Sequence, residues 1–515
     1  MLKNIQKNLL LKNPLIWNSR IIPFAALGIV FHIIFFVLGY IQGEISFEEE
    51  YKYYNYFFDT EDTIIFTSIL ISIFTTIIWL VLYSRNNAFK SFYPKHKLSL
   101  FKEWLLILAF FVFNTTSSLT YMYGKDVKAR SYFSREEIIK RTEIVSGASI
   151  FLRGELNVSE YSTVEKKNAD GTLDYIQVKV DSFDYNKRKY PIKSLLNKKI
   201  NSFIIFNDEQ DSLRELKIKN WLVQEKKDSV KLLFNNFLKL TKEHNLKANI
   251  TADQWFDLVY KSPEFDKHIQ VGTSKHSFFN ENYYQEAVEV ESEYIEAENE
   301  IDTLSQTIKI ENGQEQIYSK YYVPFDAIHN SYSAIVKAYE NPNVNFEVLT
   351  FFFSFIIGLS IIVFSFKVTS GKNWLIALVS LGIIGIIAGI ISVLIRYDTA
   401  FSILYLFVFG CLSIYFLIIL SSKTKKGISG ITLNQMLWMF PAFFPIIYFI
   451  VYEIIKEVSG YNAYRYEEPI KKQFPEVDFM ENHTIEMFAI NIIIIFIFML
   501  VMSRQIKKWK GIAED

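Results

Sequence analysis

Eight long apolar segments constrain this chain more than any other feature of its sequence. Each has about 20 residues, enough for an α-helix rising about 1.5 Å per residue to cross a hydrocarbon core of about 30 Å. The first is too long for the apolar region of a signal peptide and no small-residue cleavage site follows it, so we expect it to remain as a helix. The sequence predicts a polytopic α-helical membrane protein with eight transmembrane helices, at residues 21–41, 63–83, 103–123, 346–366, 374–395, 400–421, 431–452 and 484–503.

Lysine and arginine are unevenly distributed among the short segments that join these helices. Six lie in the segments on one side, and eighteen lie on the other side, in residues 1–20, 84–102, 367–373, 422–430 and 504–515. Because basic residues resist translocation, the side with eighteen is expected to be cytoplasmic. Both termini are therefore predicted to be cytoplasmic, with 1–20 as an interfacial segment, 504–515 as a tail and 453–483 as an external loop.

Residues 124–345 form a polar block between the first three helices (21–123) and the last five (346–503), and its length is that of a domain. Its first part has short runs typical of strands, whereas the apolar residues from Asp228 to His244 recur at helical spacing. Thr251 and Gln254 form a capping-box pattern before another helix, which Pro263 should end. We expect an inserted extracytoplasmic α+β domain, with strands at 148–152, 175–180 and 203–206 and further helices at 284–306 and 325–340.

The composition argues against several classes of function. Lys+Arg and Asp+Glu both number 55, so no excess charge favours nucleic acid. The only cysteine, Cys411, excludes a disulfide framework within one chain. The acidic stretch from Glu281 to Asp302 could attract calcium or a basic partner, but it lacks a calcium-loop pattern and fits a solvated helix face better. We recognise no metal or cofactor motif, no phosphate-binding loop and no catalytic constellation, so an enzyme is the least supported class.

Polar side chains are few inside the predicted helices, where ionisable groups are costly and usually mark function. The candidates are His32, Asn114, Glu486 and Asn491, with Glu103 at the inner start of the third helix. For His32 we favour a structural hydrogen bond to another helix over a proton relay. Glu486 lies close enough to the interface to be hydrated. This scarcity of buried charge lowers the hypothesis of a proton- or sodium-driven transporter.

Two of the apolar segments carry residues that affect helix packing and shape. Gly382, Gly385 and Gly389 form a small-residue stripe on the fifth predicted helix, where another helix could approach closely, within one chain or in a homo-oligomer. Pro441 and Pro445 lie four residues apart in the seventh, and each removes a backbone N–H. We expect a kink or a broken helix there, which could serve gating or only shape.

Two basic segments predict a contact surface on the cytoplasmic side. The N-terminal segment places lysines around leucines and ends in Asn13–Trp17, so it can lie as an interfacial helix in the headgroup layer. The loop of residues 84–102 mixes aromatic and basic residues. Anchoring to anionic lipid of the bilayer would explain both segments without a protein partner. The candidate partner contacts are Arg85, Phe89, Lys90, Phe92, Tyr93 and Lys95.

The segment Lys12–Ile16 leading into the first helix, the loop between the second and third helices and the missing ATPase motif together resemble the permease subunits of ABC-2-type transporters. Asn13–Trp104, with "NPLIWNSR" and "YSRNNAFKSFYP", also resembles multi-span membrane proteins of Bacteroidota, which implies a bacterial inner membrane. The permease resemblance implies an elbow helix and a first intracellular loop that contact a separate ATP-binding subunit. Our leading hypothesis is a permease or accessory subunit of an ABC-type export system. The alternative is a non-transporting scaffold or sensor whose external domain binds envelope components.

Overall fold

The computed structural model describes residues 7–510 except for 9, 48–59, 86–97, 168–172, 276–304, 312–313, 396–398, 423–427 and 462–473. The chain divides into two compact units, which we treat separately. The first, the helical bundle, comprises residues 1–39, 56–124 and 343–515. The second, the inserted unit, comprises residues 40–55 and 125–342.

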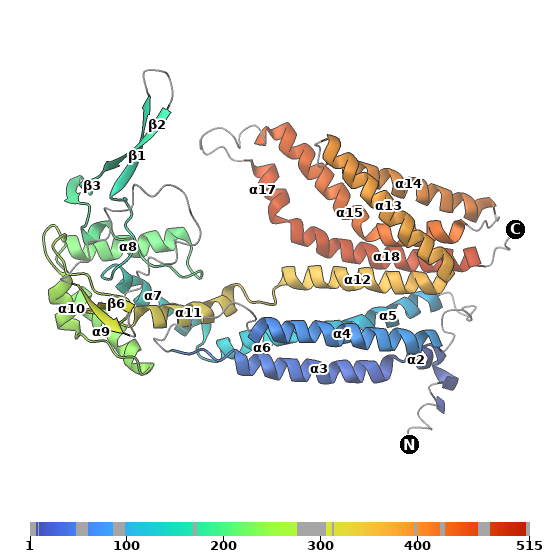
Figure 1. The fold of residues 1–515 in the computed structure, drawn as a ribbon, viewed down its shortest axis with the longest axis horizontal. Helices are drawn as coiled ribbons and strands as arrows, with labels where there is room; N and C mark the ends of the chain where they lie inside the picture. The colour runs from blue at the N-terminus through green and yellow to red at the C-terminus, as the bar shows by residue number, and fades with distance from the viewer. Residues whose placement is uncertain are drawn as a thin grey trace. The chain divides into compact units, whose positions relative to one another are not determined.

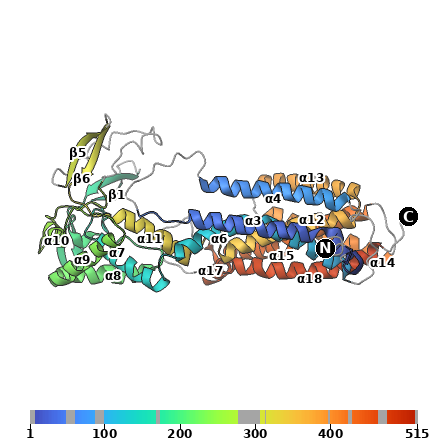
Figure 2. The ribbon, with the colours of Figure 1, turned by 90° about the horizontal axis from the view of Figure 1, so that it is seen from below.

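The helical bundle consists of long apolar helices that run along one another (Figures 1 and 2). Among the described residues, seven helices are long and apolar enough to span a membrane, and a bent helix pair raises the number to eight. The chain is therefore a polytopic helical membrane protein, as its sequence predicts. Its helices are α2 (Pro14–Ser19), α3 (Ile21–Gln42), α4 (Thr60–Arg85), α5 (Ser99–Thr115), α6 (Ser117–Arg130), α12 (Phe346–Val368), α13 (Gly371–Ile395), α14 (Thr399–Ser422), α15 (Ser429–Ser459), α17 (Pro475–Asn482) and α18 (Thr484–Lys510).

The third predicted span differs from a single straight helix. Helices α5 and α6 meet at Thr116 with a bend of 49°. The residues around the break, Asn114 to Thr120, are mostly amides and hydroxyls. Thr115 and Thr116 each donate their hydroxyl hydrogen to the carbonyl four residues earlier, at 2.7 and 2.6 Å. Such bonds compete with the backbone ladder and bend helices, which accounts for the break.

Glycines of α3, rather than those of α13, make the close helix contacts within the bundle. A Cβ added at Gly28 would lie 2.2 Å from the carbonyl oxygen of Phe113, and one at Gly39 would lie 2.0 Å from that of Tyr121. Helix α3 therefore packs with its backbone against the bent α5–α6 pair. At Gly382, Gly385 and Gly389 of α13 an added Cβ would meet nothing within 4 Å. The described residues of the same chain therefore leave this stripe open, and packing of the three glycines in a homo-oligomer stays a prediction.

Helix α15 continues without a break from Ser429 to Ser459, although Pro441 and Pro445 lie inside it. The helix is therefore not broken at the prolines, and the kink predicted at Pro441 and Pro445 stays a prediction. Pro445 has no N–H to give to the carbonyl of Pro441, four residues earlier. Asn491 of α18 donates its amide Nδ2 to that carbonyl at 2.8 Å and so replaces the missing bond. The neighbouring helix satisfies the backbone that the proline leaves open.

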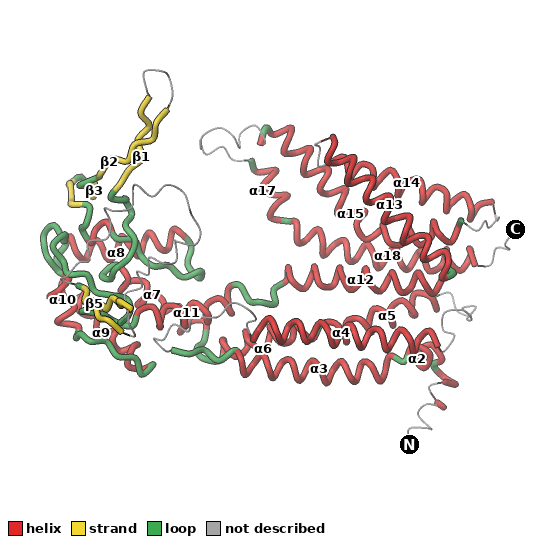
Figure 3. Tube along the Cα trace, in the orientation of Figure 1, coloured by secondary structure: helices red, strands yellow, loops and turns green. Residues whose placement is uncertain are grey.

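The inserted unit has a helical core with hairpins attached to it (Figure 3). Trp255, Phe234 and Phe237 are fully or almost fully buried at its centre, with the Trp255 and Phe234 rings stacked 4.1 Å apart. Its helices are α7 (Arg135–Ser149), α8 (Asp208–Val223), α9 (Lys227–Glu243), α10 (Ala252–Val259) and α11 (Phe325–Glu340). Three antiparallel hairpins are formed by β1 (Tyr161–Lys167) with β2 (Leu173–Lys179), β3 (Ser182–Tyr185) with β4 (Arg188–Pro191), and β5 (Gln306–Glu311) with β6 (Gln314–Ser319).

The predicted elements of this unit are partly confirmed. The helices predicted at 228–244 and 325–340 correspond to α9 and α11, and the strand predicted at 175–180 corresponds to β2, which ends one residue earlier at Lys179. The Thr251–Gln254 capping box is present, with both reciprocal bonds. The strand predicted at 148–152 is wrong because α7 extends to Ser149, and residues 203–206 form a turn. The helix predicted at 284–306 and the acidic stretch from Glu281 to Asp302 fall almost entirely outside the described residues.

Candidate functional site

A buried ion pair joins three helices at one end of the bundle. Glu103 of α5 pairs with Lys367 of α12, and their side chains are only 8% and 9% exposed. Tyr83 of α4 donates its hydroxyl to Glu103 Oε1 at 3.0 Å, and the Lys367 ammonium lies 5.5 Å from the centre of the Tyr83 ring. Separating such charges in a membrane protein is costly, so the pair holds α4, α5 and α12 together strongly.

The position of each charge within its helix explains how the pair forms. Lys367 lies in the last turn of α12, where the helix dipole favours a cation. Glu103 lies near the start of α5, and consecutive spans bring the end of one and the start of another to the same face of a membrane. The sequence alone indicates Glu103 as a polar residue at the inner start of the third predicted helix, whereas Lys367 falls among the basic residues expected to be cytoplasmic. The sequence signal for the pair is that the two ionisable residues lie at the same predicted depth.

Hydrogen bonds from tryptophan indoles extend these contacts along α12. Trp104 of α5 donates to Ser360 Oγ at 2.9 Å, and Trp438 of α15 donates to Ser365 Oγ at 2.7 Å. The hydroxyl of Thr369, just past the end of α12, bonds to the amide of Asn434 at about 3.0 Å. Helix α12 thus contacts α5 through one set of polar groups and α15 through another.

A short helix precedes the first span and is attached to the second. In α2, Pro14 is the first helical residue, and the chain turns at Arg20, whose φ is 55°. Trp79 of α4 donates its indole N–H to the carbonyl of Ser19 at 2.8 Å, and the Arg20 guanidinium lies 4.9 Å from the centre of the Trp17 ring. The predicted interfacial segment therefore contains a distinct helix that is joined to α3 by a turn and fixed to α4.

A second polar contact lies at the break between α5 and α6. The two ring nitrogens of His32 lie 3.2 Å from Thr120 Oγ1 and 3.1 Å from Thr116 Oγ1. Ser68 of α4 bonds to Ser117 at 2.9 Å on the same bent pair. A neutral imidazole has one donating and one accepting nitrogen, so His32 can bond to both hydroxyls at once, and each threonine hydroxyl also lies within hydrogen-bond distance of a backbone carbonyl. This geometry supports the structural interpretation of His32.

The other predicted intramembrane residues have different surroundings. Asn114 is 2% exposed and donates to the carbonyl of Phe110 at 2.9 Å. Asn491 is equally buried and serves the proline-containing helix α15. Glu486 lies in the first turn of α18 and is exposed, as expected for a hydrated position. Of the predicted partner contacts, Arg85 ends α4, and Phe89, Lys90, Phe92, Tyr93 and Lys95 lie outside the described residues.

The inserted unit contains a charged and aromatic cluster beside α7 and α11. Arg141 bonds to Glu243 at 2.7 Å and to Tyr332 at 3.2 Å, and its guanidinium lies 4.2 Å from the centre of the Phe133 ring. His244 accepts or donates a bond to the Tyr332 hydroxyl at 2.9 Å. Burial lowers the pKa of His244, and the Arg141 charge lowers it further. The neutral imidazole is therefore favoured, and the cluster is a structural network.

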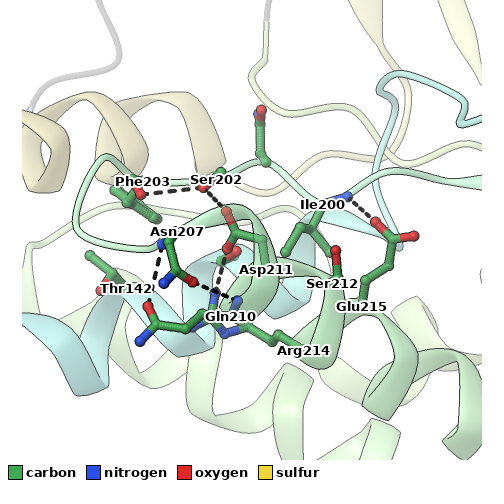
Figure 4. Close-up of polar contacts among 12 residues, drawn as sticks. Thr142, Ile200, Ser202, Phe203, Asn207, Gln210, Asp211, Ser212, Arg214 and Glu215 are labelled. Carbon is green, nitrogen blue, oxygen red and sulfur yellow. Dashed lines mark hydrogen bonds and ion pairs between the residues drawn. The ribbon is translucent and has the colours of Figure 1, made fainter. Parts of the chain in front are cut away.

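A separate polar network surrounds the start of α8 (Figure 4). Asn207 accepts from the backbone N–H of Gln210 at 2.8 Å, and the Gln210 side chain returns a bond to the N–H of Asn207. Asp211 binds the Ser202 hydroxyl and pairs with Arg214 at 2.8 Å. The reciprocal bonds of Asn207 and Gln210 satisfy open backbone N–H groups of the helix terminus, and the Asp211 contacts join side chains around it. Within the described part of the chain, no cluster of His, Cys, Asp and Glu could hold a metal ion.

Comparison with known proteins adds no relative to this description. No protein family, no curated protein and no solved structure matches the chain.

Proposed function

We propose that this chain is a membrane-embedded permease or accessory subunit of an ABC-type export system in a bacterial inner membrane. A separate ATP-binding subunit would dock on the cytoplasmic loop from Arg85 to Lys102. Residues 124–345 would form an extracytoplasmic domain that handles cargo or a partner, and both termini would be cytoplasmic.

The ion pair of Glu103 with Lys367 is the observation that carries this proposal. Tyr83 lies two residues before Arg85, and Glu103 follows the loop directly, so the Tyr83–Glu103 bond closes the base of the loop. Lys367 then connects that base to α12. A force applied to the loop by a docked subunit would therefore reach α12 through a buried, charge-assisted contact. The anchored helix α2 supports the same proposal, because it has the position of an elbow helix.

The open glycine face of α13 favours a second candidate. Gly382, Gly385 and Gly389 meet no described residue of the same chain, so they are available to a second copy. A scaffold or sensor that only anchors and dimerises would use its spans in this way, and its external domain would bind envelope components. This candidate requires no ATP-binding subunit.

Companion subunits distinguish the two candidates. We would purify the full-length chain in mild detergent, identify bound proteins by mass spectrometry and measure ATP hydrolysis by the preparation. The loop variant Arg85→Glu with Lys90→Glu and Lys95→Glu should lose an ATP-binding subunit that the wild type retains. The matched control changes Lys423, Lys425 and Lys426 to Glu, three bases in another loop on the same predicted side. A wild-type preparation without any ATP-binding subunit would sink the export proposal.

The proposed orientation has an independent test. Cysteines introduced at Ser182 and Ser459 should react with a membrane-impermeant thiol reagent in cells with a permeabilised outer membrane, and a cysteine at Ser91 should resist it. Cys411 should be changed to Ala in all three variants to remove background labelling. Labelling of Ser91→Cys with protection of the other two would invert the topology.

A further inference from the structure

Residues 43–47, which follow α3 in the chain and which we call the strap, are attached to the rest of the inserted unit by two hydrogen bonds. The backbone N–H of Ile45 donates to the Tyr132 hydroxyl at 3.0 Å. The Ser331 hydroxyl of α11 donates to the backbone carbonyl of Ser46 at 3.1 Å. Because serine and tyrosine hydroxyls stay neutral near pH 7, neither bond changes its charge in that range.

A third attachment of the strap is aromatic. The Phe47 ring stacks on the imidazole of His244, the residue directly after α9, with ring centres 3.8 Å apart and planes 6° from parallel. The rings of Tyr132 and Tyr332 meet Phe47 edge-on at 6.2 and 6.1 Å. Of these three aromatic partners of Phe47, His244 alone changes its charge between about pH 5 and 8.

The hydrogen bonds of the imidazole indicate which of its nitrogens carries a hydrogen. Arginine can only donate, so the Arg141 bond at 3.2 Å uses the Tyr332 hydroxyl oxygen as its acceptor. The single hydrogen of that hydroxyl is then left for Nε2 of His244, 2.9 Å away. Nε2 therefore acts as an acceptor, and the neutral imidazole carries its hydrogen on Nδ1.

Protonation of the imidazole is incompatible with this arrangement. A hydrogen on Nε2 would point at the Tyr332 oxygen, which already accepts from Arg141. Tyr332 is fully buried, and its own hydroxyl hydrogen would lose its acceptor, which is costly. Two cations would also share one neutral oxygen. In agreement with this geometry, burial lowers the pKa of His244, the Arg141 charge lowers it further, and Glu243 opposes them.

The two acids of this network offset the effect only in part, because both are paired with Arg141. Glu137 lies 2.9 Å and Glu243 lies 2.7 Å from its guanidinium. The other ionisable residues of the adjoining segments are Lys242 beside the end of α9, Lys128 near the Tyr132 ring and the exposed Glu44 of the strap. Glu48–Glu50 follow Phe47 in the sequence and fall outside the described residues.

We propose that the strap is an acid-sensitive latch, which the neutral imidazole of His244 holds on the inserted unit and which protonation of that imidazole releases. In the bound state Nε2 keeps its bond to Tyr332, and the ring keeps its stack on Phe47. At acidic pH the imidazolium loses its bond to Tyr332 and turns toward water, so Phe47 loses its stacking surface. The strap then separates from α9 and α11. The latch is independent of the proposed export function, because it requires no ATP-binding subunit.

A nitroxide label on the strap tests this proposal in the full-length protein in detergent. Ser46→Cys is labelled after Cys411→Ala has removed the only native cysteine, and its mobility is measured by electron paramagnetic resonance from pH 7.5 down to pH 4.5. Mobility should increase below the ordinary histidine pKa of 6.5, with the ratio of released to bound strap rising by up to about tenfold per pH unit. A label at Ser212 on α8 should not respond, and Phe47→Ala should leave the strap label mobile at every pH.

Three outcomes would overturn the latch. An unchanged Ser46 label would show that the strap stays bound in acid. A less mobile Ser46 label would show that the imidazolium holds Phe47 more tightly, as a cation over an aromatic ring can. An equal response of the Ser212 label would show general acid unfolding of the inserted unit.

Matched variants assign the release to His244. His244→Gln keeps an acceptor for the Tyr332 hydroxyl but gains no proton in this range, so its strap should stay bound at every pH tested. Arg141→Gln removes the neighbouring cation and should move the release midpoint to higher pH. Glu243→Gln removes a neighbouring negative charge and should move it to lower pH, which keeps the test decisive if Arg141→Gln does not fold. The exposed acid Glu136 is the control, because Glu136→Gln should leave the midpoint unchanged. The same pH response in His244→Gln as in the wild type would refute the assignment.

Discussion

Both units bury large apolar side chains, but the helical bundle also exposes many of them along its long helices. On α4 of the helical bundle, Ser68 is 1% exposed while Phe74 is 62% exposed. On α9 of the inserted unit, Phe234 and Phe237 are fully buried and the charged residues point outward. The same chain therefore uses apolar side chains as the core of both units and, in the bundle, as much of the surface as well. Only a change of solvent from water to lipid makes both arrangements favourable.

The difference shows which interactions specify each unit. Burying apolar area stabilises the inserted unit, because water is the alternative environment for Trp255 and its neighbours. In the bundle, lipid tails are as apolar as the helices, so exclusion of apolar side chains from water contributes little between helices. Close backbone contacts at Gly28 and Gly39 and the polar contacts of Glu103 and His32 must then select the helix partners.

The largest expected effect tests the buried charges of the bundle. Glu103→Met leaves the Lys367 ammonium without its counter-charge and should lower the stability by about 3 to 5 kcal/mol. Glu103→Met combined with Lys367→Met removes both charges and should recover most of that loss. Thermal unfolding in detergent measures both variants. If the double variant is no more stable than the single one, the ion pair does not explain the stability of the α5–α12 contact.

A large effect of opposite sign, an increase in stability, is expected when the buried charge of Lys198 in the inserted unit is removed. The pKa of Lys198 is about 8 in the folded protein and 10.5 in its ordinary state, a difference worth about 3 kcal/mol. This cost is fully present below pH 8 and disappears as the pH rises toward 10.5, because the unfolded chain then also loses the proton. In chloride, Lys198→Met should therefore stabilise the protein at pH 7 by up to about 3 kcal/mol.

The pH dependence of that gain is its control. The Tm advantage of Lys198→Met over the wild type should shrink between pH 7 and pH 10. Lys219→Met should instead lower Tm at pH 7, because it removes the cation that pairs with Glu215 and leaves that carboxylate only uncharged partners, Asn157 and the backbone N–H of Ile200. A Tm advantage of Lys198→Met that is equal at both pH values would show that charge burial is not its cause.

The spans could be predicted from the sequence because composition alone decides them. Helices such as α3 and α12 are apolar over most of their length, so they are recognised without knowledge of their neighbours. The break at Thr116 was missed because an average over a window hides the polar run from Asn114 to Thr120. The run itself is present in the sequence, and a cluster of hydroxyl residues within a predicted span indicates a bend of this kind.

The remaining features depend on partners far away in the sequence. The bond from Asn491 to the carbonyl of Pro441 supports the continuous helix α15. The residues around the prolines do not indicate this bond, because its donor lies on another helix. Likewise, Lys367 forms a site with Glu103 only when α12 lies against α5. In the inserted unit, the apolar run at residues 203–206 resembles a strand, but Phe203 packs against His329 and no neighbouring strand is available to it among the described residues.

Leucine substitutions at two glycines, Gly39 of α3 and Gly385 of α13, test which helix faces are in close contact. Gly39→Leu places a side chain against the backbone of Tyr121 and should cost about 1–3 kcal/mol through overpacking. Gly385→Leu meets nothing within the chain, and leucine has the higher helix propensity, so Tm should stay the same or rise slightly. A lower Tm for Gly385→Leu in detergent would show that a second copy contacts α13, and cross-linking would then identify the dimer.

The smallest expected effect concerns a helix start in the inserted unit. Thr251 accepts from the N–H of Gln254 at 3.3 Å, and the Gln254 side chain accepts from the N–H of Thr251 at 2.9 Å. Thr251→Ala removes one of these bonds and should lower the stability by about 1 kcal/mol, whereas Thr251→Ser should be nearly silent. Because α10 holds Trp255 in the core, hydrogen exchange of the α10 amides should report the loss locally. Equal exchange in the Ala and Ser variants would show that packing of Trp255, rather than the cap, determines where this helix begins.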